Sequence, residues 1–232
     1  MMLCLPDVLT RDELVKIQSA LASGEFVDGR ESVGFLGRRV KNNLQLPRES
    51  PAVLTLGPII EAALRRHILF DWAVWPKRID GIRFSRYDTG MEYGAHIDNA
   101  LMGRRRAEGQ RDAPDRLRGD VAFTVFLSDP ADYDGGELVI ESTLGPQEIK
   151  LAAGEAVVYP ASTLHRVAPV TRGQRLAAVG WVQSLIRDPA RREILFDLER
   201  LKRFLAEKLP EATEATLVFK TQSNLLRMWA EP

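Results

Sequence analysis

Hydrophobic and polar positions divide the chain into a helical beginning, a central stretch of short strands and a helical end. Near the beginning, Thr10 and Glu13 have the spacing of a capping box, in which each side chain bonds a free amide at the start of a helix. Apolar residues then recur every three or four positions, which predicts an amphipathic helix that runs to about Ala22. A second pattern of this kind follows Pro51 and predicts a helix that continues towards Ile68.

From about residue 79 the apolar residues come in short runs that are separated by glycine, proline and polar residues. Some runs alternate, as at Val121, Phe123 and Val125, and alternation is typical of a strand with one buried face. Short strands at roughly even spacing predict an antiparallel sandwich or barrel. The expected strands cover residues 82–87, 121–127, 137–141, 147–151, 156–159, 165–170 and 176–182.

The last part of the chain returns to a helical pattern. Asp188 and Pro189 are suited to the N-cap and first turn of a long helix, which Pro210 ends, and a last helical stretch reaches Trp229. We expect the leucine-rich face of the long helix to pack on the sheet, and a contact with a second copy of the chain is the alternative. The predicted organisation is N-terminal helical and β elements over 1–78, a β core over 79–183 and a small C-terminal helical unit over 184–232.

The composition favours a soluble globular protein. Of the 232 residues, 45% are hydrophobic and 28% are charged. The 32 basic and 32 acidic side chains give a formal net charge of zero, so the chain as a whole has no attraction to polyanions. One cysteine excludes an intrachain disulfide, and no apolar run indicates a signal peptide or a membrane span. We therefore expect a cytoplasmic protein without a nucleic-acid or membrane partner.

One segment, Asn99 to Gly119, has no strand pattern and is long for a loop inside a domain. Loops of this length are often functional lids, and this one is locally basic although the whole chain is neutral. A solvated loop with scattered charge is the alternative. Its arginines are Arg104, Arg105, Arg106, Arg111, Arg116 and Arg118.

Two of the three histidines occur where a metal site built on strands would need them. Because side chains alternate along an extended segment, His96 and Asp98 are expected to point the same way. A neighbouring strand can bring His165 alongside. Two imidazoles and one carboxylate on one face form the facial triad of non-haem Fe(II) oxygenases, which leaves three coordination positions open. The alternative is that both histidines are ordinary strand residues bonded to backbone.

Arg175 strengthens the first interpretation. It follows His165 by ten residues, and the turn signal at residues 171–174 predicts that the two residues lie on neighbouring strands of a hairpin. An arginine beside an iron site is suited to bind a carboxylate with two hydrogen bonds. Without the triad, a surface arginine on a strand would be the simpler interpretation.

The segment from Tyr87 to Asp98 matches a Y-x-x-G-x-x-Y-x-x-H-x-D signature, and in this it resembles the prolyl 4-hydroxylase-like 2-oxoglutarate/Fe(II) dioxygenases. Residues 40–43, 170–173 and 181–188 add further matches, and the whole set looks most like the bacterial PKHD-type hydroxylases. The resemblance covers essentially the whole chain, including the C-terminal helices. It shows no departure at the positions that would bind metal or carboxylate.

This resemblance implies a mainly β fold, with a double-stranded β-helix (jelly-roll) core flanked by helices and with iron at its mouth. It implies that His96, Asp98 and His165 bind Fe(II) and that Arg175 binds the distal carboxylate of 2-oxoglutarate. Tyr87 matches the family tyrosine whose hydroxyl supports this co-substrate. The other motif tyrosine, at position 93, is expected to pack beside the metal-binding strand, and His67 is expected to be structural.

The activity implied by the resemblance is hydroxylation of a substrate with O₂, which converts 2-oxoglutarate to succinate and CO₂, with L-ascorbate as a candidate reductant. No catalytic residue is expected beyond the metal ligands. The substrate is left open between a peptidyl or amino-acid compound and an iron-chelating small molecule linked to iron uptake. Two other classes compete: a cupin-like non-redox metalloenzyme, against which Arg175 argues, and a non-catalytic sensor of iron or 2-oxoglutarate.

Overall fold

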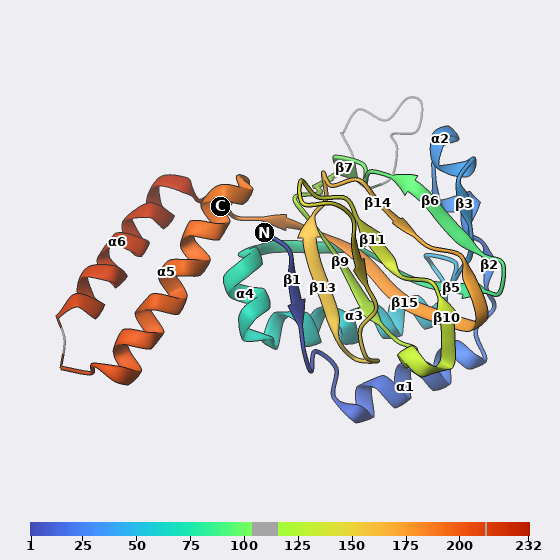
Figure 1. Cartoon of the computed structure of the whole chain (residues 1–232), viewed down its shortest axis with the longest axis horizontal. Helices are drawn as coiled ribbons and strands as arrows, with labels where there is room; N and C mark the ends of the chain where they lie inside the picture. Colours follow the sequence, from blue (N-terminus) through green and yellow to red (C-terminus); the bar gives the residue numbers. More distant parts are fainter. Residues whose placement is uncertain (104–115, 212) are drawn as a thin grey trace.

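Two antiparallel sheets face each other in the middle of the protein (Figure 1). The computed structural model describes residues 1–103, 116–211 and 213–232. In the larger sheet the strands follow the order β1-β13-β9-β15-β5-β4-β2, with β10 paired to β15. Their bounds are β1 Leu3–Leu5, β2 Val27–Asp28, β4 Leu44–Gln45, β5 Pro76–Asp88, β9 Val121–Phe126, β10 Tyr133–Gly135, β13 Ala156–Pro160 and β15 Val170–Ser184.

The smaller sheet has the order β12-β11-β14-β6-β3 and covers one face of the larger sheet. Its strands are β3 Lys41–Asn42, β6 Glu92–His96, β11 Leu138–Ile140, β12 Gln147–Ile149 and β14 His165–Val167. Apolar side chains from both sheets form a shared core between them, including Phe126, Leu138 and Val157. This arrangement confirms the predicted mainly β, jelly-roll architecture.

Helices cover the other face of the larger sheet, and a second core lies between them and the strands. The alternation along β9 divides its side chains as predicted, since Val121, Phe123 and Val125 all belong to this second core. The covering helices are α1 Arg11–Ala22, α3 Pro51–Arg66 and α4 Ile68–Val74. None of the helices in the described residues is long and apolar enough to cross a bilayer.

The helix expected from Pro51 to Ile68 is in fact two helices. The backbone of His67 is extended, with φ −80° and ψ 114°, so the residue is both the C-cap of α3 and the N-cap of α4. Its Nε2 lies 2.8 Å from the carbonyl oxygen of Pro6, which supports the structural role expected of His67. The break lets α4 turn and place Phe70 in the core beneath the sheet.

Short elements lie near the end of the sandwich where β6 ends and β3 begins, namely η1 Gly29–Ser32 and α2 Phe35–Arg38 (Figure 1). Another short helix, η2 Pro130–Asp132, precedes β10. The segment expected to be a long loop without strands begins and ends in a short ladder of β7 Leu101–Met102 with β8 Leu117–Arg118. Residues 104–115 lie outside the described residues, so the lid remains a prediction.

The C-terminal helices form a hairpin that extends away from the sheets (Figure 1). They are α5 Pro189–Lys208 and α6 Glu214–Trp229. The expectation that α5 packs on the sheet was wrong, because α5 contacts α4 and α6 instead. Leu195 and Phe196 are buried by these contacts, whereas Leu201 and Leu209 on the same apolar pattern remain exposed.

The expected hairpin between His165 and Arg175 was also wrong. His165 lies on β14 of the smaller sheet and Arg175 lies on β15 of the larger sheet. The turn signal at 171–174 is part of β15, where Gly173 adopts φ +73° opposite Tyr133 of β10. The chain crosses from one sheet to the other at Ala168 and Pro169, and the two side chains approach because the two sheets face each other.

Candidate active site

Three potential metal ligands meet between the sheets at the mouth of the sandwich. His96 ends β6 and His165 begins β14, and the two residues are direct partners in the register of the smaller sheet. Asp98 follows β6 by two residues. The ligand atoms of these three side chains lie within 4.8 Å of one another, with 4.0 Å between Nε2 of His165 and Oδ2 of Asp98. The predicted triad is thus brought together, and Ile97, which lies between two of its members in the sequence, is exposed.

Backbone carbonyls fix the orientation of both imidazole rings. Nδ1 of His96 lies 2.8 Å from the carbonyl oxygen of Gly94, and Nδ1 of His165 lies 2.9 Å from that of Thr163. A carbonyl oxygen can only accept, so Nδ1 must donate its hydrogen in each ring. The Nε2 lone pairs are therefore free to bind a metal.

Tyr93 packs against the metal strand, as expected from the sequence. Its ring stacks on the His96 ring, with 3.6 Å between centroids and 15° between planes. On the other side of the pair, the rings of His96 and His165 are 4.3 Å apart and tilted by 54°. Stacking and the carbonyl bond together hold His96 in one orientation before any metal binds.

The protonation states suit a metal. Burial, together with the nearby His165, lowers the pKa of His96 to about 4, so this imidazole is neutral at neutral pH. Burial raises the pKa of Asp98, against the opposing effect of His165. A buried carboxylate is costly without a cation, and Fe(II) bound at this point would stabilise it. Two neutral imidazoles and one carboxylate are the donor set of the facial triad, so the residues present fit iron.

Arg175 lies deeper in the sandwich and is almost fully buried, with 1% of its surface exposed. It is the direct register partner of Tyr87, and its guanidinium carbon lies 5.2 Å from the Tyr87 ring and 5.4 Å from the Phe126 ring. Its Nε has no hydrogen-bond partner among the described residues. A buried guanidinium with a free donor is suited to bind a carboxylate. The two aromatic rings would keep the guanidinium in a fixed orientation for this contact.

The hydroxyls around Arg175 come from two tyrosines. Burial raises the pKa of Tyr87, against the opposing charge of Arg175. Tyr133, to which the sequence analysis gave no role, is fully buried, and its hydroxyl has no partner among the described residues. Its pKa is raised by burial and lowered by Arg175. Both phenols therefore keep their protons and can donate to an anion bound at the arginine.

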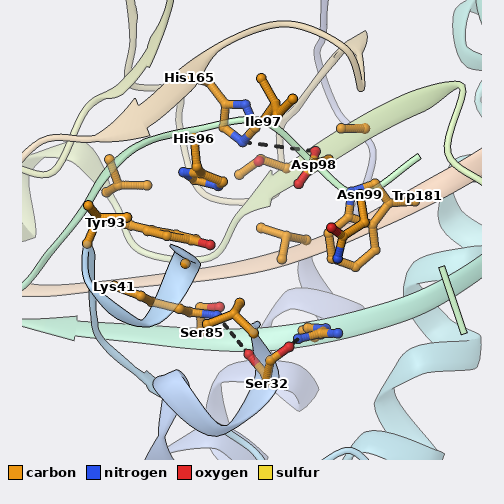
Figure 2. Close-up of a pocket in the computed structure, with 18 of the residues that line it drawn as sticks. Ser32, Lys41, Ser85, Tyr93, His96, Ile97, Asp98, Asn99, His165 and Trp181 are labelled. Carbon is orange, nitrogen blue, oxygen red and sulfur yellow. Dashed lines mark hydrogen bonds and ion pairs between the residues drawn. The ribbon is translucent and has the colours of Figure 1, made fainter. Parts of the chain in front are cut away.

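A single cavity of about 1040 Å³ joins the triad to Arg175 and Tyr87. Its wall also contains two cationic residues to which the sequence analysis gave no role, Arg83 and Lys41. Lys41 is labelled in Figure 2. One signal could have found Arg83, because it alternates with Ser85 and Tyr87 along β5 and therefore shares their face. Lys41 lies in the family match at residues 40–43, but that match gave it no place in the site, since its two-residue strand joins the sheet from far along the chain.

Two arginines of the basic loop, Arg116 and Arg118, belong to the described residues. Arg118 at its end does not line the cavity, because it forms an ion pair with Asp120 at 2.8 Å and with Glu231 at 2.6 Å. Arg116 is exposed. The remaining arginines of the loop lie outside the described residues.

Comparisons with known proteins agree with this geometry. A family model described as the 2OG-Fe(II) oxygenase superfamily matches residues 82–183. A PKHD-type hydroxylase from Synechococcus sp. (strain JA-2-3B'a(2-13)) is 51% identical over 231 residues, which covers 100% of both chains.

Solved structures show the same fold at low identity. A prolyl hydroxylase from Trichoplax adhaerens, in complex with a hypoxia inducible factor oxygen degradation domain peptide fragment, has a TM-score of 0.55 at 16% identity. That alignment covers 78% of this chain and 82% of the other. HygX from Streptomyces hygroscopicus, with nickel and 2-oxoglutarate bound, has a TM-score of 0.51 at 18% identity and covers 80% and 84% of the two chains.

Proposed function

Since the chain belongs to the PKHD-type hydroxylases of the 2OG-Fe(II) oxygenase superfamily, we propose that it hydroxylates a C–H bond of its substrate in the cavity that contains His96, Asp98 and His165. The chain is a 2-oxoglutarate- and Fe(II)-dependent dioxygenase. The observation that carries the site assignment is the meeting of three metal-binding side chains in one cavity with a buried, incompletely bonded arginine.

The triad would hold Fe(II) through Nε2 of both histidines and a carboxylate oxygen of Asp98. When bound there, iron supplies the activation of O₂ with 2-oxoglutarate as co-substrate, and the products are succinate, CO₂ and the hydroxylated substrate. The Nδ1–H groups of His96 and His165 donate to backbone carbonyl oxygens and both Nε2 atoms would bind the metal, so neither ring is available as a general acid or base. No proton-transferring residue beyond the metal ligands is therefore assigned.

Arg175 would bind the distal carboxylate of 2-oxoglutarate, and Tyr87 would donate its hydroxyl to the same co-substrate. The guanidinium is fixed between two rings, so it is oriented before the co-substrate arrives. Its burial excludes water from the carboxylate and strengthens a charge-assisted pair. Bound in this way, the co-substrate would lie in the cavity that joins Arg175 to the triad.

For the primary substrate we keep both classes: a peptidyl or amino-acid compound and an iron-chelating small molecule. The relation to hydroxylases supports the first class. The site geometry is compatible with either, since the cavity is larger than 2-oxoglutarate needs. We further propose that the reaction takes place in the cytoplasm with ascorbate as reductant. We expect no nucleic-acid partner, and the neutral net charge of the chain supports this expectation.

The proposed function is tested by the conversion of 2-oxoglutarate to succinate under air with Fe(II). The wild-type protein should form succinate slowly even without substrate, and Asp98→Ala should reduce this rate at least ~100-fold because it removes a metal ligand. Asp197→Ala, an exposed carboxylate on α5, is the matched control and should behave as wild type. Equal succinate formation by Asp98→Ala and wild type would contradict the site assignment.

A further inference from the structure

Two cationic side chains that the proposed reaction does not use lie in the wall of the active-site cavity. Lys41 comes from β3 and Arg83 from β5, and both line the cavity that contains the triad. Both bond to Ser32, with 2.8 Å from Lys41 Nζ to Ser32 Oγ and 3.1 Å from Arg83 Nη1 to the Ser32 carbonyl oxygen (Figure 2). Two positive charges from separate strands therefore meet at one point of the wall.

Among the described residues, neither cation forms an ion pair with a carboxylate that belongs to it alone. Lys41 is 4% exposed, and its hydrogen-bond partner is a neutral hydroxyl. The carboxylates that act on it in the described chain are Asp28, which is exposed and bonded to Arg30, and Asp98. The carboxylate that acts on Arg83 is again Asp98. Since Asp98 is assigned to the metal and Asp28 is bonded to Arg30, neither cation keeps a carboxylate of its own among the described residues once iron is bound.

The formal charges of the loaded site lead to the same conclusion. Iron and Asp98 together carry one positive charge, and Arg175 adds a second. The two negative charges of 2-oxoglutarate balance them. The positive charges of Lys41 and Arg83 remain, in a cavity where an unpaired charge is strongly disfavoured. Burial and the neighbouring Arg83 lower the pKa of Lys41 to about 7, and an anion bound beside it would favour the charged form.

We propose that Lys41 and Arg83 form an anion subsite for the primary substrate, which therefore carries a carboxylate or phosphate group. This inference rests on the proposed function, because it assigns Asp98 to iron and Arg175 to the co-substrate. The apolar part of the substrate would lie along Trp181 and the exposed apolar side chains of Phe35 and Leu36, which line the same cavity.

The position of the subsite restricts where the substrate is oxidised. The ring of Tyr93 lies between His96 and Lys41, stacked on the former and 5.0 Å from Nζ of the latter (Figure 2). The anionic group is thus separated from the metal ligands by the width of an aromatic ring. The oxidised C–H bond is several bonds away from the anionic group.

The test uses calorimetry on protein loaded with Zn(II) and saturating 2-oxoglutarate, so that no turnover occurs and the Arg175 subsite is filled. The probes are 3-phenylpropanoate, 2-phenylethylphosphonate and the neutral 3-phenylpropanamide. At least one anion should bind at least tenfold more tightly than the amide, and the better anion distinguishes carboxylate from phosphate. Equal affinity of all three, or no binding of either anion, would overturn the proposal.

Variants locate the effect. Lys41→Met and Arg83→Met, on separate strands, should each weaken binding of the anion at least tenfold and leave binding of the amide unchanged. Lys16→Met, on the exposed face of α1, is the control and should change neither affinity. Zn(II) and 2-oxoglutarate affinities and melting temperatures are measured on every variant. If Zn(II) or 2-oxoglutarate does not bind to the wild-type protein, the proposed function is contradicted. The affinities for the anions and the amide are then measured on the metal-free protein, which tests the subsite separately. Unchanged anion binding in either folded variant contradicts the subsite.

Discussion

Arg175 depends for its position on a residue that has no side chain. Gly136 adopts φ +67°, and a Cβ at this position would lie 3.0 Å from Cδ of Arg175 and 3.1 Å from the Tyr133 ring. Both neighbours are buried and cannot move far. The glycine therefore does two things: it permits a left-handed backbone and it leaves room for the arginine.

Gly136→Ala should weaken 2-oxoglutarate binding several-fold, because the added methyl group displaces Arg175, while Zn(II) affinity stays as in wild type. The substitution should also cost ~1–2 kcal/mol of unfolding free energy from the left-handed backbone alone. Gly145→Ala is the matched control, since Gly145 has φ +97° but no atom within 4 Å of its Cβ position. Identical 2-oxoglutarate affinities in the two variants, measured by calorimetry, would show that Gly136 does not position the arginine.

At the scale of residues, the sequence predicted the part of the site that depends on local geometry. His96 and Asp98 face the same way because they are two positions apart in an extended segment. Lys41 and Arg83 could not be predicted as a pair, since only the joining of β3 to the smaller sheet brings Lys41 into the cavity. That pairing depends on contacts between distant parts of the chain, which no local pattern encodes.

Helix α1 shows how far an element can be predicted from its ends. Thr10 and Glu13 form the predicted capping box, and the helix ends at Ala22 as expected. By contrast, the break between α3 and α4 was missed because it occurs at a histidine, and neither a glycine nor a proline marks this position in the sequence. The expectation that β14 and β15 form a hairpin was wrong for a different reason. The chain crosses between the two sheets there, and the crossing is decided by which strand faces the core buries.

The cap of α1 gives a pH-dependent prediction. Glu13 also pairs with Arg66, and this bond, with further help from Thr10, lowers its pKa to about 2 from an ordinary value of 4.5. A lowered folded-state pKa stabilises the protein above pH 4.5, and the stabilisation is lost as the pH falls towards 2. Glu13→Gln should therefore lower the unfolding free energy by ~1 kcal/mol at pH 7, a figure kept small because the pair is partly solvated.

Urea unfolding at pH 7 and at pH 2.5 measures this difference. The gap between wild type and Glu13→Gln should shrink markedly at the lower pH. Glu61→Gln, which removes the exposed pair between Glu61 and Arg65 within α3, is the control and should show a smaller effect. An equal gap at both pH values would mean that the charge on Glu13 contributes nothing.

At the scale of the whole molecule, the C-terminal hairpin is tied to the β core through Arg118. This arginine bonds Asp120, the carbonyl oxygen of Ser184 at the end of β15, and Glu231 beyond α6. The backbone of Glu231 also donates to Leu185 at 2.8 Å. These bonds hold the C-terminal end of the chain beside the segment that leads into α5.

Arg118→Met should weaken the attachment of the C-terminus to the β core, because it removes both ion pairs of Arg118 and leaves the mostly buried Asp120 with one partner fewer. We expect a loss of ~1–3 kcal/mol in unfolding free energy and faster hydrogen exchange over residues 225–232. Arg200→Met, which removes a surface arginine 3.9 Å from Asp197 on α5, is the control. Unchanged exchange at the C-terminus in Arg118→Met would mean that packing and the backbone bond to Leu185 hold the C-terminus without Arg118.

The most direct test of the account is the visible charge-transfer absorbance that Fe(II) and 2-oxoglutarate give together when both bind one site without oxygen. The wild-type protein should develop this band. His96→Ala should abolish it, and Arg175→Met should require at least ~10-fold more 2-oxoglutarate to reach it because a charge-assisted carboxylate contact is lost. Arg172→Met, on the same strand but exposed, should match wild type. Absence of the band in wild-type protein that has bound both iron and 2-oxoglutarate, or its full retention in His96→Ala, would contradict the assignment of the site.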